Sequence, residues 1–600
     1  MGNINSERIN RLRELMKRDG IHYYIVPTSD PHMSEYLCDH YKLREYLSGF
    51  TGSAGTLLVS DDEAFLWTDG RYYIQAEKEL EGSGIKLMRM QDEGVPTIFE
   101  YLETNVSDDQ VIGFDGNVVS VSFFMELCDI MPDDAGFRTD VCYAGEVWED
   151  RPERPAEKVM VLSDDISGKP ASEKIEDIRR FLSDCSMDAC FLADLSDIMW
   201  IFNIRGNDIP YNPVAYSYAV ISRDDAVLFI DEACMSEELK SASSENGYRL
   251  MLYEGIFEFA EEKKNDPEMS EIICDFSSIN HRLFNILNEY EYLADIPSHE
   301  YIKKHIKNET EISLSRRYHI EDAVSVINWI YDIKEMLKER KITEYAAAKL
   351  VDEYRGRCDG FVEPSFATIC AYAENGAIVH YEPEKEGSKY LEKGGFVLLD
   401  SGGQYKGATT DITRTVALGE LSYEEKRAYT AVLKGHLRLM SLIFLKGVRG
   451  ENIDIAARSP IWEIYTDYKH GTGHGVGSFL NVHEGPQSFN YHIREEKVQP
   501  ILESGMITSD EPGIYIEGKY GIRLENLLLC VEKEKNEWGT FLAFEPLSLV
   551  PFERDAIITE MLNEDELNAL NDYHKLVYDT LKDRFEGEML DWFEEQTDPL

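Results

Sequence analysis

Four acidic residues in the C-terminal half of the chain follow or interrupt apolar runs. Asp400 comes directly after the apolar residues of GGFVLLDSGGQY, and Asp411 lies in the β-branched stretch GATTDITRTVAL. Glu511 stands beside a proline in GMITSDEPGIYI, and Glu525 lies within GIRLENLLLCV. We expect these runs to be strands, with Asp411 and Glu525 inside them. A buried carboxylate is costly unless it is paired or binds a metal, so the four acids are candidate metal ligands.

Three histidines fall in the glycine-rich segment KHGTGHGVGSFLNVHEGP, residues 469–486. His470 and His474 have the i, i+4 spacing of two ligands on a helix, but the glycines between them make a regular helix unfavourable. We therefore expect loop and strand here, with a separate role for each ring. Four carboxylates and one imidazole suit a pair of divalent ions such as Mn²⁺ better than a thiolate-selecting site. From spacing alone, surface acids and ordinary loop histidines are the competing interpretation.

The elements that would position these residues form three predicted domains. Helical patterns alternate with apolar strand-like runs over residues 1–152 and again over 153–306, which indicates two α/β domains. Proline and charge concentrate in EDRPERPAEK (149–158), as in an interdomain linker. A long helical pattern opens the third domain, residues 307–600, which continues with glycine-punctuated strands and a charged helical tail.

The bulk composition restricts the class of partner. With 43% hydrophobic and 11% aromatic residues, the 600-residue chain can build several packed cores. The net charge of −52, from 61 basic and 113 acidic residues, disfavours binding to nucleic acid or to anionic lipid. No apolar run is long enough to cross a bilayer, so no membrane partner is expected. Ten scattered cysteines without a CxxC pair fit reduced thiols in the cytoplasm.

Taken together, the motifs resemble those of the pita-bread metallopeptidases, and among these the long, three-domain form of aminopeptidase P, the Xaa-Pro aminopeptidases. The resemblance covers essentially the whole chain. It implies an α/β (α+β) fold class, with two creatinase-N-like α/β domains followed by a C-terminal pita-bread catalytic domain. The motifs that carry it are SFATICAYAENGAIVHY, LLDSGGQY, TTDITRT, HGTGHGVGSFLNVHEGP, DEPGIY, GIRLEN, DGRYYIQA and FEPLSLVPF.

The resemblance also implies a set of five metal ligands, namely Asp400, Asp411, His474, Glu511 and Glu525. Asp411 and Glu525 would bridge two ions, Asp400 would bind one of them, and His474 and Glu511 would complete the other. The implied ions are two Mn²⁺ per subunit, with Zn²⁺ or Co²⁺ as alternatives. A metal-bridged hydroxide would hydrolyse the N-terminal Xaa-Pro bond and release the first residue, with Glu511 accepting its proton.

Three further histidines acquire implied roles in the same way. His380, in NGAIVHY, is expected near the substrate and its departing group. His483 would donate to the scissile carbonyl oxygen, a type of donor whose loss costs about 2.7–4 kcal/mol. His470 would line the pocket around the proline side of the bond. Each could instead be a loop or core histidine with ordinary hydrogen bonds.

Two arginines and a tyrosine complete the predicted site. Arg523 lies two residues before Glu525, so strand alternation places both side chains on one face. By resemblance, Arg523 and Tyr515 support Asp400 and fix the geometry of the ligands. Arg71, in DGRYY, would contact the substrate, or else belong to a surface turn after a strand.

The same residues, with the chain length, distinguish this activity from those of related enzymes. The complete ligand set argues against creatinase, which uses no metal, and against a binding module that has lost catalysis. The length and the middle domain argue against a prolidase and against methionine aminopeptidase. The expected substrates are therefore peptides with proline at the second position, and the expected assembly is a homodimer.

Overall fold

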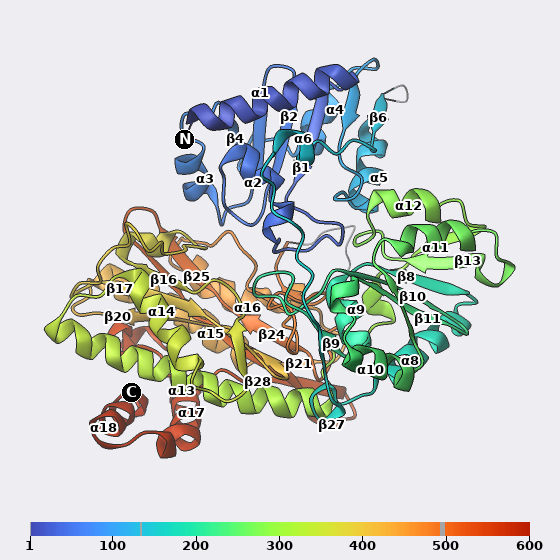
Figure 1. The fold of residues 1–600 in the computed structure, drawn as a ribbon. Helices are drawn as coiled ribbons and strands as arrows, with labels where there is room; N and C mark the ends of the chain where they lie inside the picture. The colour runs from blue at the N-terminus through green and yellow to red at the C-terminus, as the bar shows by residue number, and fades with distance from the viewer. Residues whose placement is uncertain (1, 133–134, 493–498) are drawn as a thin grey trace. The chain divides into compact units, whose positions relative to one another are not determined.

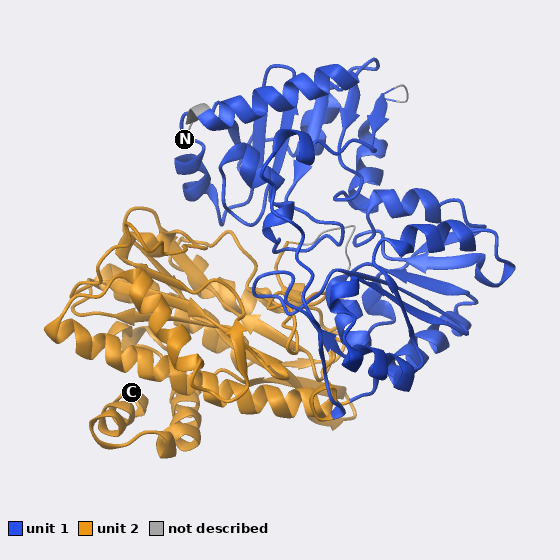
Figure 2. Cartoon of the chain, in the orientation of Figure 1, with its two compact units in different colours: residues 1–164, 169–302 blue, residues 165–168, 303–600 orange. Residues whose placement is uncertain are grey.

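The structure is a computed structural model that describes residues 2–132, 135–492 and 499–600. The chain divides into two compact units (Figure 2), unit 1 with residues 1–164 and 169–302 and unit 2 with residues 165–168 and 303–600. Helices and strands occur in both units, and the predicted α/β (α+β) fold class is confirmed. The boundaries 1–152, 153–306 and 307–600 of the three predicted domains stay a prediction.

Unit 1 contains two six-stranded sheets with the same plan. Their orders are β4-β3-β2-β1-β5-β6 and β12-β11-β10-β8-β13-β14. In each sheet the three central strands pair antiparallel with one another, and the outer strands add in parallel. The strands are β1 (Tyr23–Pro27), β2 (Thr56–Ser60), β3 (Ala64–Thr68), β4 (Lys86–Arg89), β5 (Val111–Gly113), β6 (Gly136–Arg138), β8 (Ala189–Leu192), β10 (Ser217–Ser222), β11 (Ala226–Ile230), β12 (Arg249–Leu252), β13 (Glu271–Cys274) and β14 (Tyr292–Asp295).

Apolar residues on both faces of these strands explain why helices cover both sides of the sheet. In β1, Tyr24 and Val26 belong to one hydrophobic core, whereas Tyr23 and Ile25 belong to another. Two short strands, β7 (Met160–Val161) and β9 (Ile204–Arg205), pair separately. The helices of the first 302 residues are α1 (Gly2–Asp19), α2 (Leu43–Ser48), α3 (Tyr73–Glu79), α4 (Ile98–Asn105), α5 (Val121–Ile130), α6 (Ala144–Val147), α7 (Asp164–Ser167), α8 (Ala171–Asp184), α9 (Leu195–Ile201), α10 (Glu237–Asn246), α11 (Gly255–Lys263) and α12 (His281–Leu287).

Unit 2 packs long helices against small antiparallel sheets (Figure 1). Its first long helix starts after Asn308, whose side chain caps the helix in a reciprocal capping box with Glu311. One hydrophobic core joins Trp329 of this helix to Val397 and Val432. The helices are α13 (Glu309–Glu339), α14 (Glu344–Arg355), α15 (Tyr423–Met440), α16 (Gly450–Trp462), α17 (Glu564–Leu581) and α18 (Gly587–Thr597).

The strands of unit 2 form the sheets β15-β18-β19, β16-β17-β20 and β21-β28-β27-β24, with the two-stranded pairs β22-β23 and β25-β26. They are β15 (Phe361–Pro364), β16 (Ile369–Tyr372), β17 (Phe396–Ser401), β18 (Gly403–Tyr405), β19 (Ala408–Thr409), β20 (Ile412–Ala417), β21 (Ile443–Leu445), β22 (Gly473–His474), β23 (Ser488–Phe489), β24 (Ile507–Asp510), β25 (Gly513–Ile516), β26 (Tyr520–Arg523), β27 (Asn526–Asn536) and β28 (Gly539–Pro546).

The register of the strand pairs in unit 2 determines which residues lie next to the acidic residues. Asp400 of β17 lies opposite Thr413 of β20. Asp510 of β24 lies opposite Asn526 of β27, so the residues just outside these strands, Glu511 and Glu525, become neighbours. The backbone N–H of Glu525 donates to the carbonyl oxygen of Thr413 at 3.1 Å, so the two strand pairs meet although they are more than a hundred positions apart in sequence.

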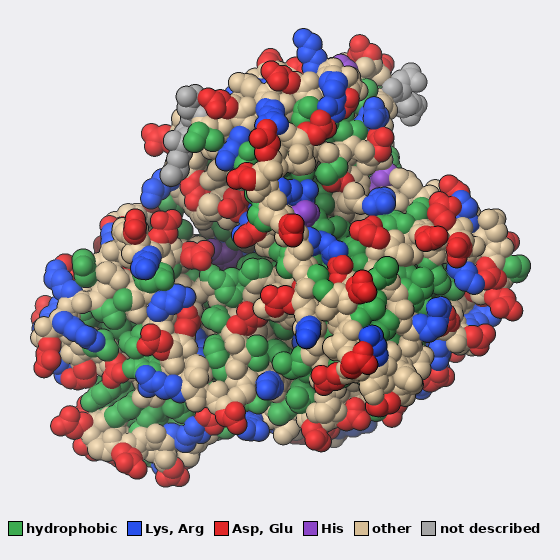
Figure 3. Space-filling view, viewed as in Figure 1, with side chains coloured by type: hydrophobic (Ala, Val, Ile, Leu, Met, Phe, Trp, Pro, Cys, Tyr) green, Lys and Arg blue, Asp and Glu red, His purple; other side chains and the backbone are tan. Residues whose placement is uncertain are grey.

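The surface of both units is acidic without a single acidic patch on the visible face. In Figure 3, Asp and Glu side chains are scattered over this face and interspersed with Lys and Arg. A solvated acidic surface accounts for this distribution. Among the described residues, no helix combines the length and the apolar character needed to span a bilayer.

Candidate metal centre

Each predicted ligand lies in a strand or in a short break between two strands. Asp400 is in β17 and His474 is in β22. Asp411 lies between β19 and β20, Glu511 between β24 and β25, and Glu525 between β26 and β27. The continuous strands predicted through Asp411 and Glu525 are therefore wrong. Because a break frees a side chain from strict strand alternation, both carboxylates can turn toward the other ligands.

Strand alternation through this segment predicts that Thr409, Asp411 and Thr413 share one face, but the break at Asp411 gives the two threonines different partners. Thr409 Oγ1 donates to the carbonyl oxygen of Leu480 at 3.0 Å. Thr413 Oγ1 donates to Glu525 Oε2 at 2.7 Å. Thr413 thus joins the acidic cluster, whereas Thr409 supports the loop that precedes His483.

The predicted ligands form one continuous cluster of potential ligand atoms. Asp411, His474 and Glu525 each belong to two groups of three, so these residues link the groups into one cluster. His474 Nε2 lies 3.5 Å from Asp411 Oδ2 and 3.6 Å from Glu511 Oε1. Within each group the ligand atoms lie within 4.8 Å of one another, and the groups are Asp400–Asp411–Glu525, His474–Glu511–Glu525 and Asp411–His474–His483.

Three buried carboxylate oxygens show whether the cluster is suited to metal ions. Asp400 Oδ1, Asp411 Oδ1 and Glu525 Oε1 are buried and have no hydrogen-bond partner in the described part of the chain. A buried carboxylate oxygen without a partner is strongly unfavourable, and a divalent cation would satisfy all three. Carboxylate oxygens with imidazole nitrogen are also the ligands that Mn²⁺ and similar ions accept. The residues present therefore fit a centre for two divalent ions.

Burial and mutual repulsion raise the pKa values of these acids. Burial, together with the charges of Asp400 and Glu511, raises the pKa of Asp411 well above its ordinary range. Burial and the charges of Asp411 and Asp400 do the same to the pKa of Glu525. Burial and the charge of Glu525 raise the pKa of Glu511 to about 7. Without a cation, the cluster therefore retains protons that a bound divalent ion would displace.

The orientation of His474 leaves one ring nitrogen for the cluster. Its Nδ1 donates to the carbonyl oxygen of Gly475 at 2.9 Å, so Nε2 is the ring nitrogen that faces the cluster. Its backbone N–H donates to Ser509 Oγ at 2.9 Å. A Cβ at Gly473 would lie 1.8 Å from the Ser509 carbonyl oxygen, so this close approach requires glycine. The described segment contains loop and strand, as predicted, and no helix.

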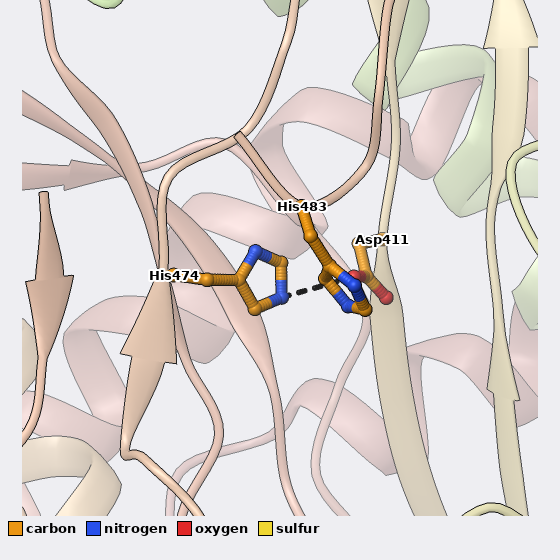
Figure 4. A group of neighbouring side chains, drawn as sticks. All are labelled: Asp411, His474 and His483. Carbon is orange, nitrogen blue, oxygen red and sulfur yellow. Dashed lines mark ion pairs between the residues drawn. The ribbon is translucent and has the colours of Figure 1, made fainter. Parts of the chain in front are cut away.

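His483 lies beside His474 rather than far from the acids. The two ring centroids are 4.3 Å apart, with the rings nearly perpendicular. Figure 4 shows the His474 ring directed toward Asp411, with the His483 ring in front of Asp411 in this view. A second imidazole is therefore available at the cluster, either for a metal or for a substrate oxygen.

Arg523 fastens several parts of the site to one another. Its side chain is 2% exposed and pairs with Asp400 Oδ2. The guanidinium also donates to Tyr515 Oη at 2.8 Å and to Thr413 Oγ1 at 3.2 Å. Because Thr413 in turn donates to Glu525, Arg523 connects two of the acidic residues. Arg523 therefore contacts a candidate ligand and Tyr515 contacts Arg523, and the supporting role that the resemblance implies for them stays a prediction.

The remaining predicted residues lie at different distances from this network. His470 Nε2 bonds to Tyr515 Oη at 2.9 Å, so His470 contacts the supporting tyrosine. His380 is half-buried in the turn after β16, and the preceding residue, Val379, accepts a 3.3 Å hydrogen bond from Arg523 through its carbonyl oxygen. Arg71 belongs to unit 1, where it makes a bidentate ion pair with Asp69, and its substrate contact stays a prediction.

Two hydroxyl residues of the site are absent from the sequence-based prediction. Thr413 bonds to Glu525, and Ser509 Oγ lies 3.4 Å from Glu511 Oε1 while it supports His474. Their positions could have indicated them in the sequence, because Thr413 and Ser509 each lie in a buried strand, two residues from a predicted ligand.

Comparisons with known proteins extend the similarity over the whole chain. The model of metallopeptidase family M24 matches residues 321–532, and the model of its C-terminal region matches residues 540–600. Two models of the creatinase/prolidase N-terminal domain match residues 8–139 and 150–311. These matches confirm the predicted arrangement of two creatinase-N-like domains followed by a pita-bread domain.

Individual relatives match this chain along most of their own length. The chain is 37% identical to Xaa-Pro aminopeptidase 1 of Dictyostelium discoideum, over 99% of this chain and 96% of that protein. It is 35% identical to aminopeptidase P2 of Arabidopsis thaliana, over 99% and 88% of the two chains. Among solved structures, the X-prolyl aminopeptidase of Caenorhabditis elegans, described as a cytosolic enzyme with a di-nuclear active site, has a TM-score of 0.93 at 31% identity and covers 99% of this chain and 100% of its own.

Proposed function

The chain belongs to the Xaa-Pro aminopeptidase family of M24 metallopeptidases, and on this premise we propose that it removes the first residue from peptides whose second residue is proline. The observation that carries the proposal is the convergence of Asp400, Asp411 and Glu525, each with a buried oxygen that lacks a protein partner. Such a cluster is unfavourable in itself and becomes favourable when it holds divalent cations.

The metal ligands are assigned from the membership of the cluster. Asp411 and Glu525 are the carboxylates that belong to two groups each, and with two oxygens apiece they would bridge two ions. Asp400 would complete one ion, and His474 with Glu511 would complete the other. When bound, the two ions would supply an acidic water molecule and would polarise the scissile carbonyl. The oxygen-rich donor set favours Mn²⁺, with Zn²⁺ and Co²⁺ as the alternatives.

The protein side chains divide the remaining chemistry among them. Glu511 would accept the proton of the attacking water, a role that needs a carboxylate within hydrogen-bond reach of that water. His483 would donate to the scissile carbonyl oxygen. His380 would act at the departing group, and His470 would shape the pocket on the proline side. Arg523, with Tyr515, would hold Asp400 and keep the ligands in place.

Selectivity for proline would come from shape. The Xaa-Pro bond is a tertiary amide without an N–H, so the pocket needs no hydrogen-bond acceptor at that position. Arg71 would contribute a substrate contact from unit 1. We further propose a homodimer in the cytoplasm. The cytosolic C. elegans relative and the absence of disulfides among the ten cysteines, all of them described, support the cytoplasmic location.

The decisive experiment compares metal-stripped and Mn²⁺-restored protein on two peptides. Arg-Pro-Pro should release arginine after Mn²⁺ is restored, and a proline-free peptide such as Arg-Ala-Ala should not. Parallel restoration with Zn²⁺ and Co²⁺ identifies the most active metal, and an Xaa-Pro dipeptide tests prolidase activity. No turnover of Arg-Pro-Pro by fully metal-loaded protein would overturn the proposal.

A further inference from the structure

Glu344, the first residue of α14, is a buried carboxylate that neutral donors surround. Its side chain is fully buried, and it belongs to no ion pair in the described part of the chain. Its two oxygens accept five hydrogen bonds, from Tyr372 N at 2.8 Å, Asn375 Nδ2 at 2.9 and 3.2 Å, Tyr381 Oη at 2.8 Å and Lys389 N at 3.0 Å. A buried carboxylate is tolerable when it is hydrogen-bonded in this way.

All of these donors come from one segment of the chain, residues 372–389, which contains His380. Tyr381, the residue after His380, donates its hydroxyl to Glu344. Val379, the residue before His380, accepts a hydrogen bond from Arg523. Both neighbours of His380 are therefore tied to buried charged groups, one through its side chain and one through its backbone.

The chemistry of Glu344 suits this role better than that of an amide. A carboxylate only accepts hydrogen bonds, so both of its oxygens can receive N–H and O–H groups. A glutamine at the same place would turn its NH₂ group, itself a donor, toward at least one of these donors. It would also lose the charge that strengthens the bonds. The loop contacts therefore require an acid at position 344.

We propose that Glu344 is a positioning residue that fixes segment 372–389 and thereby holds His380 in place to act on the substrate. The inference rests on the proposed function, because the role of His380 belongs to that proposal. Glu344 lies at the N-terminus of a twelve-residue helix packed into the core, so the segment is attached to a rigid element. A displacement of about 1 Å in a reacting group can lower the rate about 100-fold.

The matched variants are Glu344→Gln, which keeps the side-chain shape, and Tyr381→Phe, which removes one of the five hydrogen bonds. On Arg-Pro-Pro we expect E344Q to lower kcat/KM about 10- to 100-fold, and Y381F to lower it less. Metal content should stay unchanged. Glu566, a buried carboxylate of α17 that pairs with Arg438, provides the control. E566Q should keep kcat/KM within about twofold of the wild-type value.

A double-mutant cycle distinguishes positioning of His380 from general stabilisation. If Glu344 acts through His380, E344Q should cause little further loss in an H380A background. Independent losses that multiply in the double variant would overturn the inference, as would an E344Q protein with wild-type kcat/KM.

A readout that does not depend on activity separates this inference from the proposed function. Hydrogen–deuterium exchange followed by mass spectrometry should show faster exchange of amides 372–389 in E344Q than in wild type or E566Q. If the wild type failed to cleave Arg-Pro-Pro, the proposed function would fall while this measurement still tested the contacts. Unchanged exchange in E344Q would refute the positioning role.

Discussion

Breaking the buried ion pair between Lys307 and Glu484 is expected to destabilise unit 2 strongly. Lys307 Nζ lies 2.5 Å from Glu484 Oε1, and each side chain is 1% exposed. Glu484 directly follows His483, and its backbone N–H donates to the carbonyl oxygen of Gly475 at 2.8 Å. The pair therefore fastens the histidine-rich segment to the residues that precede α13.

The magnitude follows from burial. Removing one partner leaves the other charge uncompensated in the interior, which costs about 3–5 kcal/mol of unfolding free energy. Lys304 Nζ lies 3.9 Å from Glu484 Oε2 and would partly replace a lost Lys307. We therefore expect K307M at the lower end of this range and E484Q at the upper end. The double variant K307M/E484Q buries no unpaired charge at either position, so it should be more stable than E484Q.

Urea unfolding of the full-length, metal-free proteins measures these differences. The control is K341M, which removes one partner of the exposed Lys341–Glu392 pair, where N and O lie 2.6 Å apart and the side chains are 64% and 57% exposed. Solvent screens such a pair, so K341M should shift the transition little or not at all. The reasoning would be refuted if K307M and K341M behaved alike, or if the double variant lost as much as both single variants added together.

Three further outcomes are expected. In the metal-free protein, the unfolding free energy should fall as pH rises from about 4 to 7, because Glu511 (pKa raised to about 7) and its acidic neighbours bind more protons folded than unfolded. Thermal melts should then show a larger stabilisation by Mn²⁺ at pH 8 than at pH 5, and equal shifts would contradict this. T413V removes the hydroxyl that donates to Glu525, so the affinity for Mn²⁺, measured by calorimetry, should fall about 10- to 100-fold. The control is T430V, which removes the hydroxyl of another buried threonine. R523K keeps the positive charge but cannot reproduce the several hydrogen bonds of the guanidinium, so kcat/KM on Arg-Pro-Pro should fall at least about tenfold. An unchanged kcat/KM would exclude the supporting role of Arg523.

Local pattern was sufficient to predict the strand that ends near Asp400 but not the course of the chain at Asp411. An apolar run before an acid indicates a buried strand end, and Asp400 lies near the end of β17. The break at Asp411 depends on its neighbour Thr410, whose hydroxyl donates to Asp322 Oδ1 at 2.8 Å and accepts from Gly403 N at 2.9 Å. Asp322 lies on α13, far away in sequence. No periodicity within TTDITRT reports such a contact, so alternation predicts a continuous strand there.

Glu344 was missed for a similar reason. Its sequence context, ITEYAAAKL, indicates an acidic residue in the first turn of a helix. Such a residue is expected at the surface, where its negative charge interacts favourably with the helix dipole. Its burial arises because residues 372–389 fold over it and supply the donors. A long-range closure of this kind depends on tertiary structure and leaves no local pattern.

Asp322, Glu344 and Glu484 are buried carboxylates that each hold a segment near the site, and a charged group at these positions has a physical reason. Asp322, which receives bonds from Arg355 and Thr410, holds the break beside Asp411. Glu344 holds the segment of His380, and the Glu484–Lys307 pair holds that of His483. An apolar contact would stabilise these loops as much, but it is non-directional and tolerates sliding. A buried charge with several hydrogen bonds is unfavourable in any other arrangement, so it fixes direction as well as position. This requirement is greatest where side chains from separate strands must converge on the same ions.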